Sequence, residues 1–160
     1  MTNVTLREAT MTAKAATEAK IVERAVRVCR VRGLKFTPIR RRVLELLAAS
    51  RAPVPAYTLV RQLGAGKPVG PPTVYRALEF LIRAGFVRYI ALHKAYICSE
   101  LPDVNGPVAL LMCADCGDVS EVASGALKDV IAQISSSHGF DPRSRFIEVT
   151  GQCMECRSAA

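Results

Sequence analysis

Histidine is scarce in this 160-residue sequence, which contains only two, and long apolar runs are missing. No stretch approaches the roughly 20 consecutive apolar residues that a membrane-spanning helix needs. The first twenty residues, MTNVTLREATMTAKAATEAK, are polar and lack the apolar segment of a secretory signal. We therefore expect a cytoplasmic protein without a membrane partner, in a compartment where disulfides are not stable structural bonds.

Residue patterns typical of catalysis are also missing. The sequence has two histidines, no paired carboxylates within one motif and no nucleophile elbow. We therefore expect no catalytic residues, no small-molecule substrate and no enzymatic function. A thiol oxidoreductase or a zinc hydrolase is the least favoured alternative.

Acidic residues are scarce in the first part of the chain only. Residues 1–92 carry 17 Lys and Arg against 5 Asp and Glu, a net charge of +12. Residues 93–160 carry 5 against 9, a net charge of −4. This asymmetry predicts two modules with different partners, and the basic module suits a nucleic-acid backbone.

The basic part is predicted to contain helices followed by a hairpin. Apolar residues at helical spacing indicate helices within 17–34, 35–50, 54–66 and 71–85. Thr37 is the expected N-cap of the second helix, and Cys29 is expected in the core. The period changes in residues 86–100, which indicates two short strands around a turn at His93 and Lys94.

This order of elements is typical of a winged helix-turn-helix domain, which we assign to residues 1–100. In such a domain the last helix lies in the DNA major groove. Tyr75 and Arg76 lie off its apolar stripe, where an arginine can bind guanine and a tyrosine can contact thymine or phosphate. Arg40 belongs to a basic patch at the start of the second helix and is also expected to contact DNA. An ordinary solvated helix face is the alternative.

Residues 101–107, LPDVNGP, form the predicted linker to a second module over residues 108–160. Two strands around a C-x2-C pair, a helix from Ser124 to Gly139 and a third strand give this module an α+β fold. The whole chain is therefore expected to be α+β. At roughly fifty residues the second module is small, so it needs an internal staple or a partner chain.

Four of the six cysteines occur as two matched C-x2-C pairs. Four thiolates suit a tetrahedral zinc ion, and a closed thiolate shell makes that ion structural rather than catalytic. A thioredoxin-type redox pair and a secreted disulfide scaffold are the weaker alternatives. The predicted structural zinc ligands are Cys113, Cys116, Cys153 and Cys156.

The chain resembles the ferric uptake regulator family from about residue 21 to about residue 156. The matching stretches are GLKFTPIRRRVLELL, PTVYRALEFLIRAGFV, CADCGDVSEV and HGF…EVTGQCMEC. PPTVYRALEFL and the cysteine in AYICSE are most similar to the zinc uptake regulator branch. The resemblance implies a homodimer with a C-terminal dimerisation domain, and a repressor that binds a palindromic, double-stranded DNA operator when metal is bound.

By motif match, the resemblance also implies the residues that contact DNA. In addition to Tyr75 and Arg76 in the recognition helix, it implies contacts from Lys35, Tyr57 and Thr73. Lys35 lies in the GLK stretch, and Tyr57 matches a position near the DNA backbone.

The implied sensor site matches the family only in part. Cys98 and Glu121 match ligand positions of the zinc branch, whereas Arg88 stands where a histidine is usual. The stretch before the first cysteine pair, DVNGPVALLM, has no histidine. Residues that could supply the missing ligands of a second, regulatory zinc are His93, Glu100 and Asp103.

These residues predict a zinc-responsive transcriptional repressor of metal uptake genes. Filling a site between the wing and the dimerisation domain would fix the angle between the modules and thus the spacing of two recognition helices. The alternative is a family member with an altered or lost sensor. Such a protein would respond to iron, haem or thiol oxidation, or would bind DNA constitutively.

Overall fold

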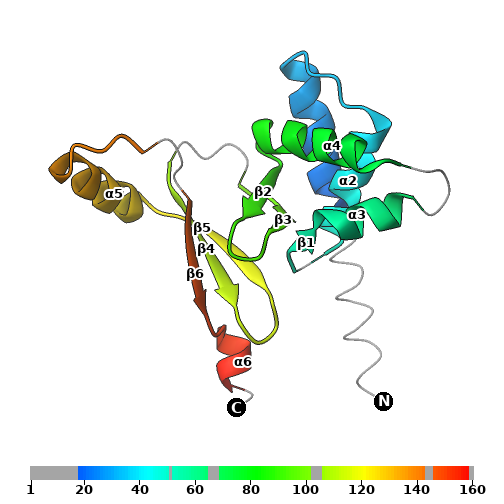
Figure 1. Cartoon of the computed structure of the whole chain (residues 1–160). Helices are drawn as coiled ribbons and strands as arrows, with labels where there is room; N and C mark the ends of the chain where they lie inside the picture. The colour runs from blue at the N-terminus through cyan, green and yellow to red at the C-terminus, as the bar shows by residue number, and fades with distance from the viewer. Residues whose placement is uncertain (1–17, 51, 65–68, 102–105, 143–145, 159–160) are drawn as a thin grey trace. The chain divides into compact units, whose positions relative to one another are not determined.

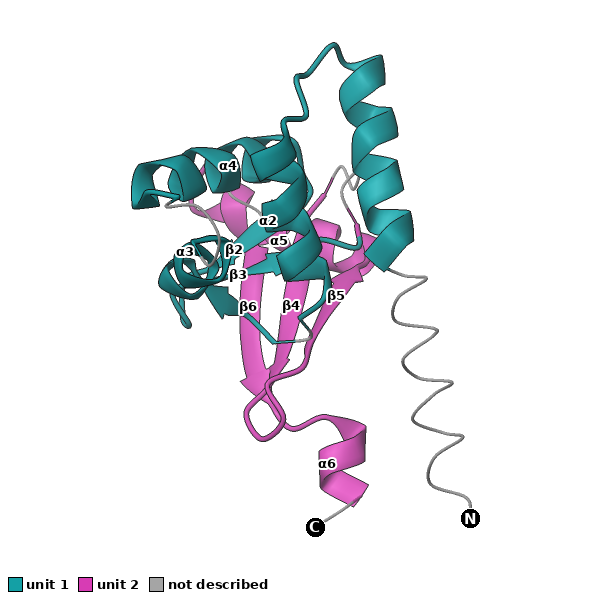
Figure 2. Ribbon diagram, turned by 90° about the vertical axis from the view of Figure 1, so that its right-hand side faces the viewer, with its two compact units in different colours: residues 1–100 teal, residues 101–160 magenta. Residues whose placement is uncertain are grey.

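Helices prevail in the described part of the first hundred residues, and a three-stranded sheet with two helices makes up the rest (Figure 1). The computed structural model describes residues 18–50, 52–64, 69–101, 106–142 and 146–158. The chain divides into unit 1, Met1–Glu100, and unit 2, Leu101–Ala160 (Figure 2). Residues 102–105 of the predicted linker lie outside the described residues. No described helix has the length and apolar character needed to cross a membrane.

Unit 1 contains a helix over residues 18–31, followed by α2 (Pro38–Ala48), α3 (Ala56–Leu63) and α4 (Pro71–Arg83). The first of these helices is followed by Gly33, whose φ of +65° suits glycine. Both α2 and α4 begin with proline, which lacks only an N–H that would have had no partner in the helix. Local sequence signals thus set where these helices begin and end.

The predicted N-cap of α2 is in the right position but does not cap through its side chain. Thr37 is the N-cap residue, with extended backbone. Its Oγ1 is buried and has no hydrogen-bond partner among the described residues. The backbone of Thr37 still acts in the cap, because its carbonyl accepts the N–H of Arg41 at 3.0 Å.

A three-stranded sheet completes unit 1 and confirms the predicted hairpin. The strands β1 (Val54–Pro55), β2 (Val87–Ile90) and β3 (Ala95–Cys98) lie in the order β1-β3-β2, with antiparallel pairing throughout. The turn contains Lys94 with a φ of +48°. The sequence did not predict β1, because two residues are too short to show a strand period.

The core of unit 1 gathers apolar side chains from all four helices and from the start of the hairpin. Cys29 is 1% exposed and lies in this core, as predicted. The fully buried large side chains of the cluster, each worth about 1.5–3 kcal/mol of burial free energy, are Val43, Leu44, Leu47, Leu59, Val74, Leu78, Leu81, Phe86 and Val87.

Helical spacing predicts a buried side of Ile39, Val43, Leu46 and Leu47 in α2, and one that includes Ile82 in α4, and both predictions are wrong in one detail. In α2, Leu44 is fully buried, whereas Ile39 and Leu46 are only half-buried. The helix contacts α3, α4 and β3, so its buried face is wider than a single stripe. In α4, Ile82 is 39% exposed, because the chain turns at Gly85 and Phe86 occupies the core instead.

Unit 2 is an α+β unit in which β4 (Val108–Cys113) is the central strand. β5 (Val119–Ala123) pairs antiparallel with it on one side, and β6 (Phe146–Gly151) pairs parallel on the other. Between β5 and β6 runs α5 (Gly125–Ser137), which confirms the predicted helix, and a short α6 (Met154–Ser158) ends the unit.

Apolar side chains remain exposed in unit 2. None of the residues of α5 is buried, although the helix carries a regular apolar pattern. The exposed large apolar side chains lie on all three strands, on α5, after α5 and on α6: Leu111, Val122, Val130, Ile134, Phe140, Phe146, Val149 and Met154. A unit this small leaves apolar surface that a second chain can cover.

Candidate metal centre and nucleic-acid interface

The two cysteine pairs meet because of the sheet topology of unit 2. Cys113 is the last residue of β4, and it lies in parallel register with Gly151, the last residue of β6. The chain continues from β6 directly into Cys153 and the short helix α6. Two neighbouring strands that run in the same direction therefore deliver both pairs to the same end of the sheet.

The four sulfur atoms have the separation that a tetrahedral zinc ion requires. They all lie within 4.8 Å of one another, and the Sγ atoms of Cys116 and Cys153 are 3.8 Å apart. Zinc–sulfur bonds of about 2.3 Å place tetrahedral sulfurs about 3.8 Å apart. Among the described residues, this is the one cluster of three or more histidine, cysteine or carboxylate groups that could share an ion.

Backbone hydrogen bonds form the turn around the first pair. The N–H of Gly117 donates to the carbonyl of Cys113 at 3.0 Å, and Gly117 has a φ of +73°. The N–H of Cys153 donates to Cys113 Sγ at 3.3 Å, and the N–H of Cys156 donates to Cys153 Sγ at 3.4 Å. Amide donors directed at sulfur stabilise thiolates, the form that binds metal.

The same contacts set different proton affinities within the cluster. The backbone N–H of Cys116, followed by that of Cys153, lowers the pKa of the Cys113 thiol to about 6. The neighbouring side chain of Cys153, followed by that of Cys116, raises the pKa of Cys156 above its usual range. Four thiolates close together repel one another, and a divalent cation removes that repulsion.

The sequence did not predict a hydrogen bond that joins the two cysteine loops. Gln152 Nε2 donates to Asp115 Oδ2 at 2.7 Å, which joins the loop of the second pair to the loop of the first. Each residue lies beside a ligand cysteine, but no spacing rule relates the two positions. All six cysteines of the chain are free.

The three predicted regulatory ligands of unit 1, all among the described residues, do not by themselves form a group that could share an ion. His93 lies in the exposed turn between β2 and β3, and Glu100 is exposed after β3. Cys98 ends β3, is half-buried, and its thiol donates to the carbonyl of Phe86 at 3.6 Å. The participation of these residues in a sensor site stays a prediction.

The other two predicted regulatory ligands belong to the unit 2 part of the chain. Glu121 lies in β5, and its carboxylate accepts the N–H of Leu101 at 3.0 Å. Asp103 lies outside the described residues. Glu121, which matches a ligand position of the zinc branch, therefore already accepts a hydrogen bond from the backbone of Leu101, the first residue of unit 2.

The predicted recognition helix α4 presents one polar face to solvent. Val74, Ala77 and Leu78 are buried, which turns the intervening positions outward. Thr73 and Arg76 are exposed, and Tyr75 is 47% exposed. This face places donor-bearing side chains on the first turns of the helix, the part that enters the groove in a helix-turn-helix complex.

The remaining predicted DNA contacts surround this helix in sequence and differ in their roles. Lys35 is exposed, and Tyr57 on α3 is 68% exposed. Arg40 is half-buried because its guanidinium lies 3.6 Å from the centre of the Phe80 ring and donates to the carbonyl of Lys35. This contact holds the Lys35 segment against α4. A DNA contact by Arg40 itself stays a prediction.

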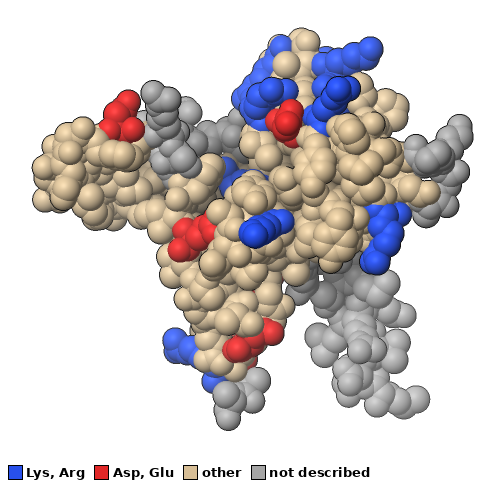
Figure 3. Space-filling view, viewed as in Figure 1, with Lys and Arg blue, Asp and Glu red and all other residues tan. Residues whose placement is uncertain are grey.

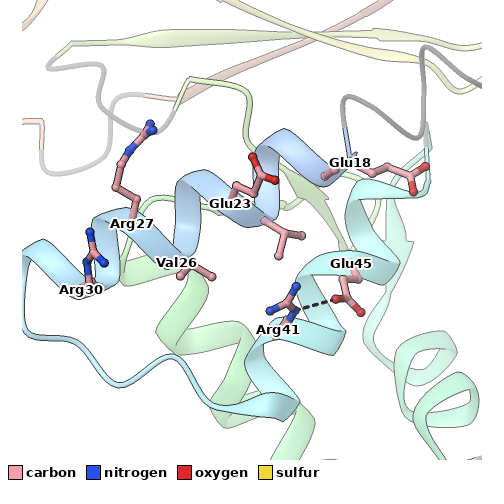
Figure 4. Close-up of a pocket in the computed structure, with 9 residues that line it drawn as sticks. Glu18, Glu23, Val26, Arg27, Arg30, Arg41 and Glu45 are labelled. Carbon is pink, nitrogen blue, oxygen red and sulfur yellow. Dashed lines mark hydrogen bonds and ion pairs between the residues drawn. The ribbon is translucent and has the colours of Figure 1, made fainter.

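Basic side chains gather on the helices of unit 1. In the view of Figure 3, Lys and Arg cluster over the helix at 18–31 and over α4. A groove of about 640 Å³ runs between the helix at 18–31 and α2, with carboxylates and guanidinium groups along it (Figure 4). Arg41 and Glu45 form an ion pair across 3.0 Å there. Because both charge signs occur in it, the groove is no simple anion site.

An exposed basic recognition helix with a wing, in one chain with a cluster of four thiols, defines a winged-helix protein of the metalloregulatory class. Residues 31–150 match the model of the ferric uptake regulator family. The zinc uptake regulation protein of Escherichia coli (strain K12) is 32% identical over 142 residues, which cover 88% of this chain and 83% of the relative. The chain therefore belongs to the ferric uptake regulator family.

Solved structures of the same family share the fold. A zinc uptake regulator complexed with zinc and DNA matches with a TM-score of 0.82 and 32% identity, over 89% of this chain and 97% of that one. The crystal structure of holo XcZur matches with a TM-score of 0.77 and 36% identity, over 88% and 99% of the two chains. These likenesses extend over both units of the chain.

Proposed function

We propose that the protein is a zinc-responsive transcriptional repressor of metal uptake genes, acting in the cytoplasm as a homodimer on a palindromic DNA operator. The observation that carries this proposal is the presence of two features in one chain, an exposed recognition helix and a four-thiol cluster with zinc spacing. Its similarity to zinc uptake regulation proteins along most of its length supports the choice of zinc.

Zinc would be held by Cys113, Cys116, Cys153 and Cys156 as a structural ion. Their sulfur separations fit tetrahedral coordination, and four thiolates leave no open coordination position for water or substrate. This supports a regulator rather than an enzyme. The ion would join the end of the sheet to α6 and so stabilise a unit with little buried core.

DNA would be bound by the first turns of α4. Arg76 would donate two hydrogen bonds to a guanine, while Thr73 and Tyr75 would contact phosphate or thymine beside it. Lys35 and Tyr57, both exposed, would contact the backbone. Two copies of this surface would be presented by a dimer that covers the exposed apolar side chains of unit 2.

A second zinc ion, bound more weakly than the structural one, would be the signal to which DNA binding responds. Cys98 and Glu121 are its expected ligands, completed from among His93, Glu100 and Asp103. A mixed thiolate, imidazole and carboxylate set suits zinc better than it suits hard ions. Because the expected ligands come from both parts of the chain, zinc would bias the protein towards the DNA-binding arrangement.

One observation favours a second candidate function. The stretch before the first cysteine pair has no histidine, and Arg88 stands at a position where a ligand histidine is expected. A family member with an altered sensor would respond to iron, haem or thiol oxidation, or would bind DNA without a signal. Such a protein would hold one tight zinc per protomer and no second site.

Elemental analysis combined with operator binding separates the two candidates. Purified protein is assayed for zinc before and after mild chelation, and DNA affinity is then followed while zinc is restored. We expect one retained and one exchangeable zinc per protomer, with affinity rising as the second site fills. The Cys98→Ser variant should keep the first zinc and lose the response. An affinity that is independent of zinc would contradict the sensing function.

A further inference from the structure

Tyrosines are concentrated where the recognition helix meets the wing. Of the four tyrosines in the sequence, Tyr75 lies in α4, Tyr89 in β2 and Tyr96 in β3. Tyr75 and Tyr89 are 47% and 45% exposed, whereas Tyr96 is half-buried against the core. Neither Tyr89 nor Tyr96 has a role in the DNA contacts proposed for α4.

Tyr89 and Tyr96 form a braced pair on one face of the sheet. They are directly opposite each other in the antiparallel register of β2 and β3, so their side chains project to the same side. Their ring centres are 5.1 Å apart and their planes are inclined by 51°. Such an aromatic contact restricts the rotamers of the exposed partner, which leaves the Tyr89 phenol presented to solvent at low entropic cost.

This pair lies close to the recognition helix. Burial raises the pKa of the Tyr96 phenol, and the neighbouring ionisable groups of Tyr75, Tyr89 and Glu79 raise it further. The helix α4 contacts β2, and Tyr96 packs against the core cluster to which Val74 and Leu78 of α4 belong, so the tyrosines of α4, β2 and β3 form one patch. The patch runs from the exposed face of α4 to β2, and the adjacent hairpin turn carries the exposed Lys94.

We propose that Tyr89 is a further DNA-contacting residue, whose hydroxyl donates to a backbone phosphate beside the bases that Tyr75 and Arg76 contact. This inference rests on the proposed DNA-binding function and extends its surface from the recognition helix to the wing. When the helix occupies the major groove, the hairpin flanks it at the bordering backbone. A phenol hydroxyl there fixes the register of the protein on the duplex without reading sequence.

The test compares two conservative variants of the full-length, zinc-loaded protein. Tyr89→Phe removes the exposed hydroxyl and keeps the ring contact with Tyr96. We expect affinity to fall about three- to tenfold on a duplex selected from random sequence by the wild-type protein, and equally on an unrelated duplex. The salt dependence of the affinity should be the same for Tyr89→Phe and the wild type, because a hydroxyl that binds a phosphate releases no counterions. Tyr96→Phe, the matched control, should leave affinity unchanged.

Methylphosphonate substitution identifies the phosphate. Neutralising each phosphate of the selected duplex in turn should reveal one position whose effect disappears in Tyr89→Phe. Equal melting temperatures of the two variants and the wild type keep the comparison free of folding effects.

Other results overturn the inference. If Tyr89→Phe binds as well as the wild type while Arg76→Ala loses affinity, the wing contact is wrong and the proposed function stands. A loss confined to the selected sequence contradicts a phosphate contact. If wild-type protein selects no duplex at all, the proposed function itself fails.

Discussion

Arg40 illustrates how an arginine near a DNA-binding helix can act through its neighbours. Its guanidinium lies over the Phe80 ring and donates to the carbonyl of Lys35, so part of this side chain is used in contacts within the protein. Sequence alone grouped it with its exposed neighbours Arg41 and Arg42, because charge does not reveal which member of a basic run folds back. Arg76, by contrast, is exposed between buried positions of α4.

At the residue scale, Arg76→Ala should weaken operator binding by about 1–3 kcal/mol and relax the preference at one base pair, because a bidentate contact to guanine is lost. Fluorescence anisotropy with the operator and with single-base variants measures both effects. Arg83→Ala removes an exposed arginine from the last turn of the same helix and should change affinity little. A uniform loss on all sequences would instead assign Arg76 to a phosphate.

The cysteine cluster makes a prediction about pH. Zinc binds thiolates, and protons compete for the same sulfurs, so apparent zinc affinity should fall as the pH falls. Near pH 7, Cys113 with its pKa of about 6 is already largely deprotonated, whereas Cys156, whose pKa is raised, must release a proton. Chelator competition between pH 6 and pH 8 should therefore still show a steep rise in affinity. A flat profile would contradict proton release on binding.

At the scale of elements, the helix at 18–31 is attached to the end of the wing by Arg24. Its guanidinium donates to the carbonyls of Ser99 at 2.8 Å and Glu100 at 3.1 Å, and the Ser99 residue is fully buried. Arg24→Met should therefore lower the free energy of unfolding of unit 1 by about 1.5–3 kcal/mol, as expected for hydrogen bonds from a charged donor. Thermal unfolding measures the loss, and Arg27→Met, on the exposed side of the helix, is the control.

Most elements could be predicted because their signals are local. Proline at the first turn, glycine at positive φ and the apolar period predicted the helices, and the change of period predicted the hairpin. The strand β1 and the helix α6 were missed because two and five residues show no period. The buried position of Leu44 depends on which elements pack around α2, and no local signal contains that information.

The candidate sites likewise contain some residues that local sequence patterns predict and others that only the fold brings together. The matched C-x2-C spacing predicted that the four cysteines share one zinc site. Each pair already places two thiols in a short loop, so the sheet needs only to bring the two loops together. The Gln152–Asp115 hydrogen bond and the Tyr89–Tyr96 pair depend on strand register, which the sequence did not reveal. For the regulatory ligands the sequence offered only partial matches, and within unit 1 the expected residues do not converge.

At the scale of the whole molecule, the two units should respond differently to loss of metal. Unit 1 has a contiguous buried core, whereas in unit 2 the helix α5 has no buried residue. Strong chelation should therefore unfold unit 2 and dissociate the dimer, while hydrogen exchange shows unit 1 still protected. The Cys153→Ser variant should behave likewise. A metal-free protein that remains dimeric, with unit 2 protected, would contradict a structural role for zinc.

The parallel pairing of β4 with β6 determines when the metal can be acquired. The thiols of Cys113 and Cys116 leave the ribosome well before their two counterparts, and the intervening helix and strand must be synthesised and arranged first. Unit 1, whose core residues all precede position 100, has by then everything it needs to fold. We therefore expect metal insertion to be a late step in biogenesis, after the DNA-binding half has all of its core residues available.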